Sequence, residues 1–225
     1  MTREPGPSAA AAALERSKLA AGATALGLTL SDDAVLRLTR LLDELGRWNA
    51  AYNLTSIRQR EGMLTHHLLD SLSIHGDLAG ATVADVGTGA GFPGLPLAIA
   101  DSGRHFTLID SNNKKVRFVA HAARALGLDN VTAVHARAEH FAAPGPFDTV
   151  VARALAPLPQ LLAEVRSLCG PGTRVLAMKG RRPDDEIAAI PPQWALVETR
   201  ALSIPGLDAE RHVVVLALAP SASPL

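Results

Sequence analysis

The spacing of apolar residues divides the chain into two parts near residue 81. Before that point the pattern is helical. From Ser31 to about Tyr52 apolar residues recur every three or four positions, and Ser31 supplies an N-cap hydroxyl. A second helix is predicted from Glu61 to about Asp77. Residues 13–80 are therefore expected to form a helical cap, preceded by a flexible, Pro-, Gly- and Ala-rich segment at residues 1–12.

After residue 81 short apolar runs alternate with helical patterns, such as those at Lys114–Leu126 and Leu158–Cys169. This alternation is typical of a parallel sheet with helices on both faces. The runs that predict parallel strands are Val83–Val86, Phe106–Ile109, Val131–His135, Thr149–Val151 and Arg174–Met178.

The end of the chain has a different pattern. Two apolar runs, Ala195–Leu202 and Arg211–Ala219, have no helix between them and predict an antiparallel hairpin. The expected fold class is therefore α/β, Rossmann-like, with a seven-stranded, mostly parallel sheet, a C-terminal antiparallel hairpin and an N-terminal helical cap. Residues 81–219 would form the sheet domain, in one compact unit with the cap, and residues 220–225 a flexible tail.

Composition narrows the function classes. The chain has 22 Lys and Arg residues against 22 Asp and Glu, so a strongly basic coat is excluded but a local basic face is not. A single cysteine, Cys169, excludes a disulfide framework and a multi-cysteine zinc site, and its helical, apolar setting suggests inert core. No apolar run approaches a membrane span, and no signal peptide is evident. We expect a cytoplasmic protein with no metal.

The strongest local motif is a glycine loop, Asp85-Val-Gly-Thr-Gly-Ala-Gly-Phe-Pro-Gly94, between the first strand and a helix. Its glycines at positions 87, 89 and 91 let the backbone turn sharply and approach a ligand. Asp85 would repel a diphosphate and attract an ammonium. S-Adenosylmethionine (AdoMet), which carries an ammonium and a sulfonium, therefore fits better than a dinucleotide, although a tight turn without a ligand remains possible.

Two further acidic positions follow later strands. Asp110 ends the second strand, where a carboxylate accepts hydrogen bonds from ribose hydroxyls, or alternatively caps the next helix. Arg137-Ala138-Glu139 follows the third strand, where an adenine would lie, or is an exposed helix start. The candidate cofactor-binding set from this reasoning is Asp85, Gly87, Gly89, Gly91 and Asp110, with Ala138 and Glu139.

These motifs resemble the class I AdoMet-dependent methyltransferases. More narrowly, the chain resembles the bacterial small-subunit rRNA guanine-N7 methyltransferase family, once called glucose-inhibited division protein B. Beside the glycine loop and Arg137-Ala138-Glu139, the likeness rests on Trp48-Asn-Ala-Ala-Tyr-Asn-Leu-Thr55, His66-His-Leu-Leu-Asp-Ser71, Asp110 with Asn113-Lys114-Lys115, Phe147-Asp148, Val151-Ala-Arg-Ala154 and Lys179-Gly180.

The resemblance implies transfer of the AdoMet methyl group to N7 of one guanine in 16S rRNA, near the decoding region, with S-adenosylhomocysteine as product. It places Gly87, Phe92, Ala138, Glu139 and Arg153 at the cofactor site. N7 has a free lone pair, so no general base is needed and alignment supplies most of the catalysis. Arg153 is the candidate catalytic residue, with a positioning role. It could pair with the cofactor carboxylate, contact a phosphate or donate a hydrogen bond to guanine O6. A structural salt bridge is the rival interpretation.

His66 and Asp70 share a helical face at i and i+4. They suggest a buried hydrogen-bonded pair between cap and sheet rather than a metal site.

Two basic clusters, each with a net charge of +4, favour an RNA face on two sides of the site. The first holds Arg104, Lys114, Lys115, Arg117 and Arg124 with Asp110; the second holds Arg174, Lys179, Arg181 and Arg182. The candidate RNA-binding residues are Lys114, Lys115, Arg117, Lys179, Arg181 and Arg182. The expected partner is 16S rRNA or the small ribosomal subunit, bound by a monomer.

Other functions remain open at this stage. The protein could methylate another RNA or a small molecule. An NAD(P)-dependent oxidoreductase would need a proton donor such as tyrosine, but the only tyrosine, Tyr52, lies outside the sheet region. A third possibility is a non-catalytic RNA-binding module that retains the cofactor fold.

Overall fold

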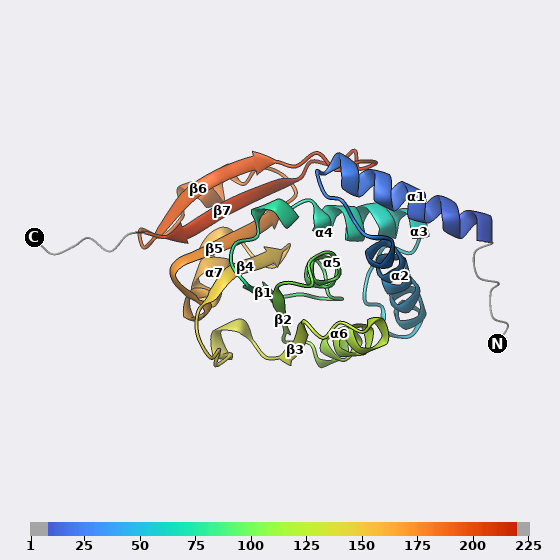
Figure 1. The fold of residues 1–225 in the computed structure, drawn as a ribbon. Helices are drawn as coiled ribbons and strands as arrows, with labels where there is room; N and C mark the ends of the chain where they lie inside the picture. The colour runs from blue at the N-terminus through green and yellow to red at the C-terminus, as the bar shows by residue number, and fades with distance from the viewer. Residues whose placement is uncertain (1–8, 220–225) are drawn as a thin grey trace, which may run out of the picture.

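The computed structural model describes residues 9–219, which form one seven-stranded sheet with helices on both faces (Figure 1). The strand order is β3-β2-β1-β4-β5-β7-β6. Strands β1 to β5 are parallel, and β7 pairs antiparallel with both β5 and β6. The predicted α/β fold with a terminal hairpin is confirmed. The strands are β1 (Thr82–Val86), β2 (His105–Asp110), β3 (Val131–His135), β4 (Phe147–Arg153), β5 (Cys169–Lys179), β6 (Trp194–Ala201) and β7 (His212–Leu218).

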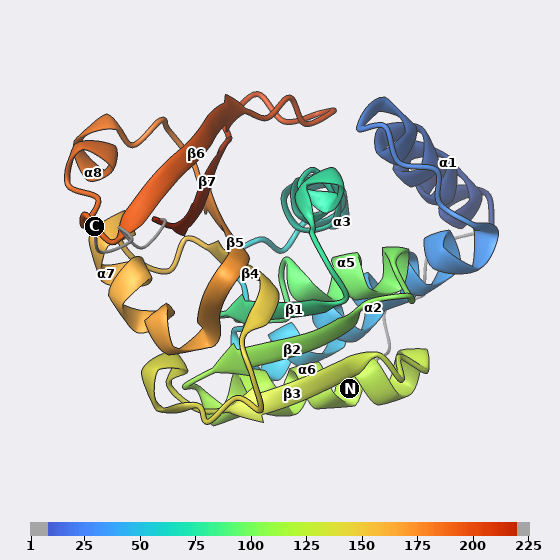
Figure 2. The ribbon, with the colours of Figure 1, turned by 60° about the vertical axis from the view of Figure 1, so that its left-hand side comes forward.

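The two faces of the sheet carry different helices. α2 (Asp32–Tyr52), α5 (Gly94–Ala100) and α6 (Asn113–Leu126) lie on one face, and α7 (Leu158–Glu164) lies on the other (Figures 1 and 2). α8 (Asp184–Ala188) contacts α7. Alternate strand residues point to opposite faces, so Val83 joins one apolar cluster and Ala84 the other. The doubly covered sheet follows from this two-sided burial.

The N-terminal helices share a core with the sheet. Leu38 and Leu42 of α2 are fully buried in the same cluster as Phe106 and Leu108 of β2. The Ser31 hydroxyl accepts a hydrogen bond from the Ala34 N–H (3.1 Å), as the sequence predicts for the cap of this helix. The helical cap is thus packed as part of the sheet domain's core.

The structure corrects two boundaries. The first helix, α1 (Ala9–Ala25), includes residues 9–12, which were expected to be frayed, because the alanine run favours a helix and Leu19 is buried. The remaining residues of the two expected flexible ends, 1–8 and 220–225, lie outside the described residues. The helix predicted up to Cys169 ends earlier, since α7 and a 3-10 turn, η4 (Arg166–Leu168), precede it.

Cys169 instead opens β5 and is buried, and burial raises the pKa of its thiol to about 12. Gly170 and Pro171 follow it, and a proline disfavours helix at the residue before it. Cys169 is therefore core, as predicted, but in a strand.

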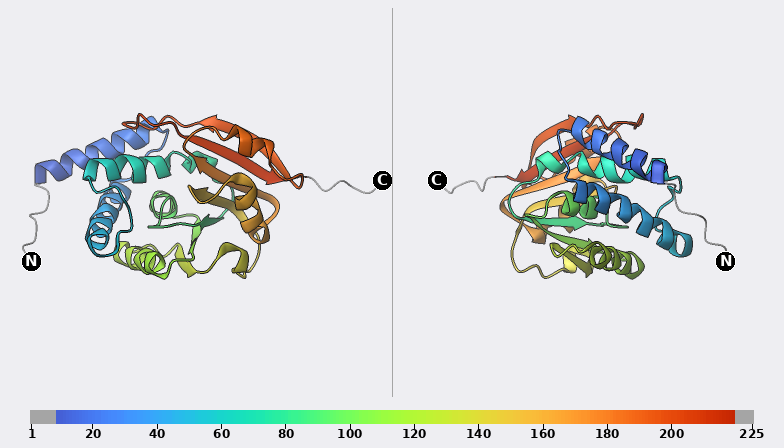
Figure 3. Two further views of the ribbon diagram at one scale, coloured as in Figure 1. Left: turned by 180° about the vertical axis from the view of Figure 1, so that it is seen from behind. Right: turned by 45° about the vertical axis from the view of Figure 1, so that its right-hand side comes forward.

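The second predicted helix is a composite. α3 (Arg60–Met63), a π-helical stretch η1 (Leu64–Leu69) and α4 (Asp70–Leu72) form it, and a 3-10 turn, η2 (His75–Asp77), follows. This stretch lies between the other N-terminal helices and the terminal hairpin, and the connection between β6 and β7 extends toward it (Figures 1 and 3). Leu202 and Ile204 of that connection are buried in the core shared with the N-terminal helices. The hairpin and this composite helix are thereby packed together.

Candidate active site at the carboxyl ends of the strands

The glycine loop follows β1 and is shaped by a buried carboxylate. Gly87, Gly89 and Gly91 all have positive φ, which glycine adopts without strain. Asp85 is fully buried, and its Oδ2 accepts hydrogen bonds from the Thr88 hydroxyl (2.6 Å) and the Gly94 N–H (2.8 Å). Burial raises the pKa of Asp85 to about 6. Its Oδ1 is buried and has no hydrogen-bond partner among residues 9–219.

Asp110 connects the same loop to β2. Its Oδ2 accepts a hydrogen bond from the Gly89 N–H (2.9 Å), and its Oδ1 accepts one from the Asn112 N–H (2.7 Å). The cap of α6 is Asn112, whose side chain accepts from the Lys114 N–H, so the alternative interpretation of Asp110 as the helix cap is wrong. Asp110 instead holds the loop and faces a cavity.

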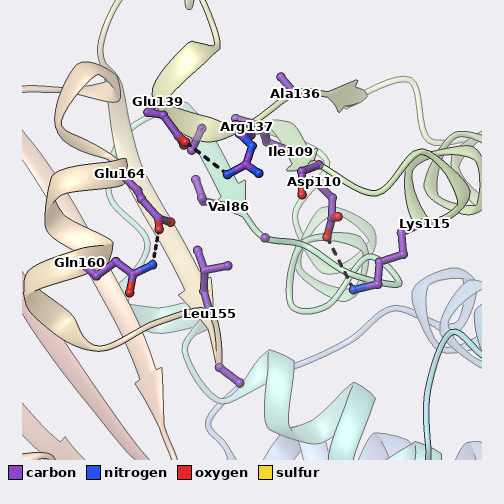
Figure 4. A pocket seen from close by; sticks show the side chains of 14 residues that line it. Val86, Ile109, Asp110, Lys115, Ala136, Arg137, Glu139, Leu155, Gln160 and Glu164 are labelled. Atoms are coloured by element: carbon purple, nitrogen blue, oxygen red, sulfur yellow. Dashed lines mark hydrogen bonds and ion pairs between the residues drawn. The ribbon is translucent and has the colours of Figure 1, made fainter.

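A first cavity of about 350 Å³ opens at the carboxyl ends of β1, β2, β3 and β4 (Figure 4). Four of the predicted cofactor residues line it: Gly87, Asp110, Ala138 and Glu139. Glu139 lies 3.8 Å from the Arg137 guanidinium. The opposite wall is built from residues that sequence reasoning missed, namely Leu155, Gln160 and Glu164.

A second cavity of about 410 Å³ shares Gly87 and Ala154 with the first. The predicted residues Phe92, Arg153 and Lys179 line it, together with His67, Asp70 and Arg211. Ala154 has a φ of 51°, a left-handed conformation that is strained for alanine. The strained residue therefore lies where the two cavities meet, directly after β4.

Arg153 is anchored by a carboxylate from the composite helix. Its Nη1 donates to Asp70 Oδ2 (2.8 Å) and to the His66 carbonyl (2.8 Å), and its guanidinium lies 5.7 Å from the centre of the Phe92 ring. The other carboxylate oxygen, Asp70 Oδ1, accepts from Arg211 Nε (3.0 Å). The rival interpretation of Arg153 as a salt-bridge residue is thus correct, although the side chain also faces the cavity.

The predicted hydrogen-bonded pair of His66 and Asp70 is wrong, because two arginines use both oxygens of Asp70 and His66 contributes its backbone carbonyl.

His67 is the buried histidine of this site. Its ring stacks on Phe92, with centroids 4.6 Å apart, and its Nε2 lies 2.9 Å from the Thr55 hydroxyl. Burial, with a smaller effect of the Arg153 charge, lowers the pKa of His67 to about 4, so the ring is neutral near pH 7. Phe92 is itself buried and fixes both His67 and Arg153.

The predicted RNA-binding residues differ in exposure and in whether their charge is already paired. Lys114 and Arg117 are exposed on α6, and Arg181 is exposed after β5. Arg182 is exposed but pairs with Asp184 at 2.7 Å, and Lys115 lies 4.0 Å from Asp110 at the first cavity.

Lys179 is only 14 % exposed. Its ammonium donates to Glu186 Oε2 and to the Ala156 carbonyl, each at 2.8 Å, so it braces two loops. The sequence predicts Lys179 as an RNA contact, whereas in the structure its charge is paired with Glu186.

Two members of the basic clusters do not flank the site. Arg104 precedes β2 and donates to the carbonyls of Gly80 and Leu78 at the amino ends of the strands. Arg174 donates to the Asp77 carbonyl. These arginines brace the edge of the sheet opposite the cavities, so the basic face is smaller than the sequence suggests.

Among residues 9–219 no cluster of three or more His, Cys, Asp or Glu residues is placed to hold a metal ion. No helix within this part of the chain is long and apolar enough to cross a membrane.

Solved structures share this architecture. A magnesium protoporphyrin IX methyltransferase from Synechocystis, solved with bound AdoMet, matches 85 % of this chain and 99 % of its own, with a TM-score of 0.58 and 17 % identity. An AdoMet-dependent methyltransferase from Aquifex aeolicus matches 70 % and 93 %, with a TM-score of 0.52 and 20 % identity. The chain therefore has the fold of the class I methyltransferases, with the glycine loop at the carboxyl edge of its sheet.

Comparison with known sequences identifies the family to which the chain belongs. A family model described as rRNA small subunit methyltransferase G matches residues 35–214. The ribosomal RNA small subunit methyltransferase G of Cronobacter sakazakii is 46 % identical over 190 residues, which cover 84 % of this chain and 92 % of that protein. The protein of the same name from Nitrosococcus oceani is 45 % identical over 87 % and 91 %. The chain belongs to the small-subunit rRNA methyltransferase G family.

Proposed function

We propose that this protein transfers the methyl group of AdoMet to N7 of one guanine in 16S rRNA. The observation that carries the proposal is the pair of cavities that meet at Gly87 and Ala154. One cavity suits a nucleoside and the other an acceptor base, so their junction is where a methyl group would pass. Membership in the family excludes the dehydrogenase alternative.

The first cavity fits the adenosine part of AdoMet. Asp110 would accept hydrogen bonds from the ribose, and Ala138 and Glu139 would flank the adenine. A Cβ added at Gly89 would meet nothing closer than 4.0 Å, so a ligand can approach this backbone. When bound there, AdoMet supplies an electrophilic methyl group on a sulfonium.

The methionine part would extend toward the junction. The unpartnered Asp85 Oδ1 suits an ammonium, and Arg153, held by Asp70, suits a carboxylate. Gly87 and Phe92, which line the second cavity, would flank this part of the ligand. Arg153 acts in this arrangement by positioning.

The transfer itself needs no base from the protein. The N7 lone pair forms the new N–CH₃ bond, and the electrons of the S–CH₃ bond return to sulfur. The positive charge moves from sulfur to the purine, so the total charge of the site does not change. Holding the two reactants in line is therefore the main contribution of the residues around the junction.

The RNA backbone would lie across the exposed basic side chains near the two cavities. Lys114, Lys115 and Arg117 on α6 and Arg181 and Arg182 after β5 are the proposed phosphate contacts. Lys179 would hold the loop that carries Arg181 and Arg182.

The test uses purified protein, methyl-labelled AdoMet, and 16S rRNA or small subunits from cells that lack the modification. We expect label in N7-methylguanosine at one site, and less of it with the Asp110→Ala variant when AdoMet is below its Kd for the wild-type protein. Comparing naked rRNA with small subunits identifies the form that is recognised. Label in another nucleoside, or none in either substrate despite AdoMet binding, would refute the proposal and point to another RNA or a small-molecule acceptor.

A further inference from the structure

Arg211 is brought to the second cavity by the antiparallel direction of β7. Lys179, the last residue of β5, pairs with His212, the first residue of β7, so β7 begins at the carboxyl edge of the sheet. Arg211 directly precedes β7 and lines the cavity with a side chain that is 23 % exposed. The residue is thus accessible and lies beside the reaction centre.

Asp70 fixes the direction of this guanidinium. The Asp70 side chain is 3 % exposed, and it accepts from Nε of Arg211 at 3.0 Å. Nη1 of Arg211 donates to the neighbouring Glu210 carbonyl at 2.8 Å. Within residues 9–219 no hydrogen bond is made by Nη2, so the arginine is held by two of its nitrogens, and the N–H groups of Nη2 remain to donate.

The other cations of the cavity are used differently. Arg153 lines the same cavity, but it directly precedes Ala154, where the two cavities meet, so it lies at the junction. The Lys179 ammonium is committed to Glu186 and a carbonyl. Arg211, which enters from β7 and not from the junction, is therefore the cation left for the acceptor side.

The acceptor chemistry defines what this donor would recognise. The edge of guanine that carries N7 also carries the acceptor O6, whereas adenine has an amino donor there. N7 must stay free to attack, which leaves O6 as the atom for recognition. We propose that Arg211, held by Asp70, donates a hydrogen bond to O6 of the acceptor guanine and thereby selects guanine for methylation. This inference rests on the proposed function.

The test compares two acceptors in one RNA. Ligated 16S rRNA is prepared with guanine or with 2-aminopurine, which keeps N7 but lacks O6, at the methylated position. We expect the wild-type protein to prefer guanine by about 10- to 100-fold in kcat/KM, the range for a hydrogen bond to a charged donor. Arg211→Ala should lose this factor with guanine and change little with 2-aminopurine.

Three controls separate recognition from other effects. AdoMet affinity of the Arg211→Ala variant, measured by calorimetry, should match the wild type. RNA binding is also measured with S-adenosylhomocysteine present. The salt dependence of this binding should be the same for the Arg211→Ala variant as for the wild type. Arg200→Gln removes another arginine that ties the hairpin to the composite helix region, through Asp77 at 2.7 Å, and should retain the preference for guanine.

The outcomes are distinct. An equal loss with both acceptors, with a smaller salt slope, would mean a phosphate contact and overturn the assignment to O6. Unchanged selectivity, or a loss of AdoMet binding, would overturn it too. Failure of the wild-type protein to label the guanine RNA, both naked and reconstituted into small subunits, would refute the proposed function itself, and the assignment with it.

Discussion

Ionisation of Asp85 should destabilise the protein that has no ligand. Burial raises its pKa to about 6, against 3.8 for the ordinary carboxyl. A group whose pKa is raised by folding stabilises the folded state most when it is protonated, below pH 3.8. That contribution is lost as the pH rises through 6. The difference between the two pKa values corresponds to about 3 kcal/mol in full, and to about 2 kcal/mol between pH 4.5 and 7.5.

The Asp85→Asn variant removes this titration and keeps the side-chain shape. The free energy of unfolding of the variant minus that of the wild type should therefore rise by about 2 kcal/mol from pH 4.5 to 7.5. Subtracting the wild-type value removes the titration of His67, which is common to both proteins. Taking the change between two pH values removes the cost of the new amide, which does not depend on pH. The pKa of His67 is lowered to about 4, so its contribution is lost as the pH falls through 6.5 to 4 in both proteins.

Urea titrations at several pH values measure the effect, and calorimetry measures AdoMet affinity on the same samples. We expect the variant to bind AdoMet more weakly by about 1.5–3 kcal/mol, because Asn cannot pair with an ammonium as a carboxylate does. If the difference in free energy of unfolding between variant and wild type does not change with pH, the argument that folding raises the pKa of Asp85 is refuted. Unchanged AdoMet affinity would remove its role toward the ammonium.

Other predictions follow from the same region and from its surface. Gly94→Ala should lower the free energy of unfolding in urea by about 1–3 kcal/mol, because the added Cβ would come within 2.7 Å of Asp85 Oδ2; unchanged stability would contradict this. Asp110→Ala should weaken AdoMet binding by about 1–3 kcal/mol in calorimetry, and equal affinity would exclude a ribose contact. Lys114→Ala should reduce the slope of log affinity for rRNA against log salt by about 1, whereas Lys179→Ala should leave it unchanged. The reverse pattern would show that the proposed RNA face is misplaced.

The sequence predicted the sheet well because the information is local. Each strand is a short apolar run, and the glycine loop is one continuous motif whose conformation depends on its own residues. Asp110 is the last residue of β2, so its place at the carboxyl edge could be deduced from the topology alone.

The second cavity could not be predicted in the same way because its contacts are distant in sequence. Asp70 meets Arg153 across 83 positions and Arg211 across 141. A helical repeat pairs Asp70 with His66, and only the packed structure shows that arginines use the carboxylate. Lys179 was misjudged for a related reason, since charge counting does not reveal that Glu186 folds back onto it.

The ion pair between Asp70 and Arg211 has a consequence for a chain that is still being synthesised. The hydrogen bonds of Asp85 and Asp110 to the glycine loop all lie within residues 85–110. The contact of Asp70 with Arg211, by contrast, requires the residue that precedes the last strand of the sheet. A nascent or truncated chain that ends before Arg211 therefore contains the whole glycine loop but lacks a guanidinium of the second cavity, so that cavity is complete only in a chain that extends to β7.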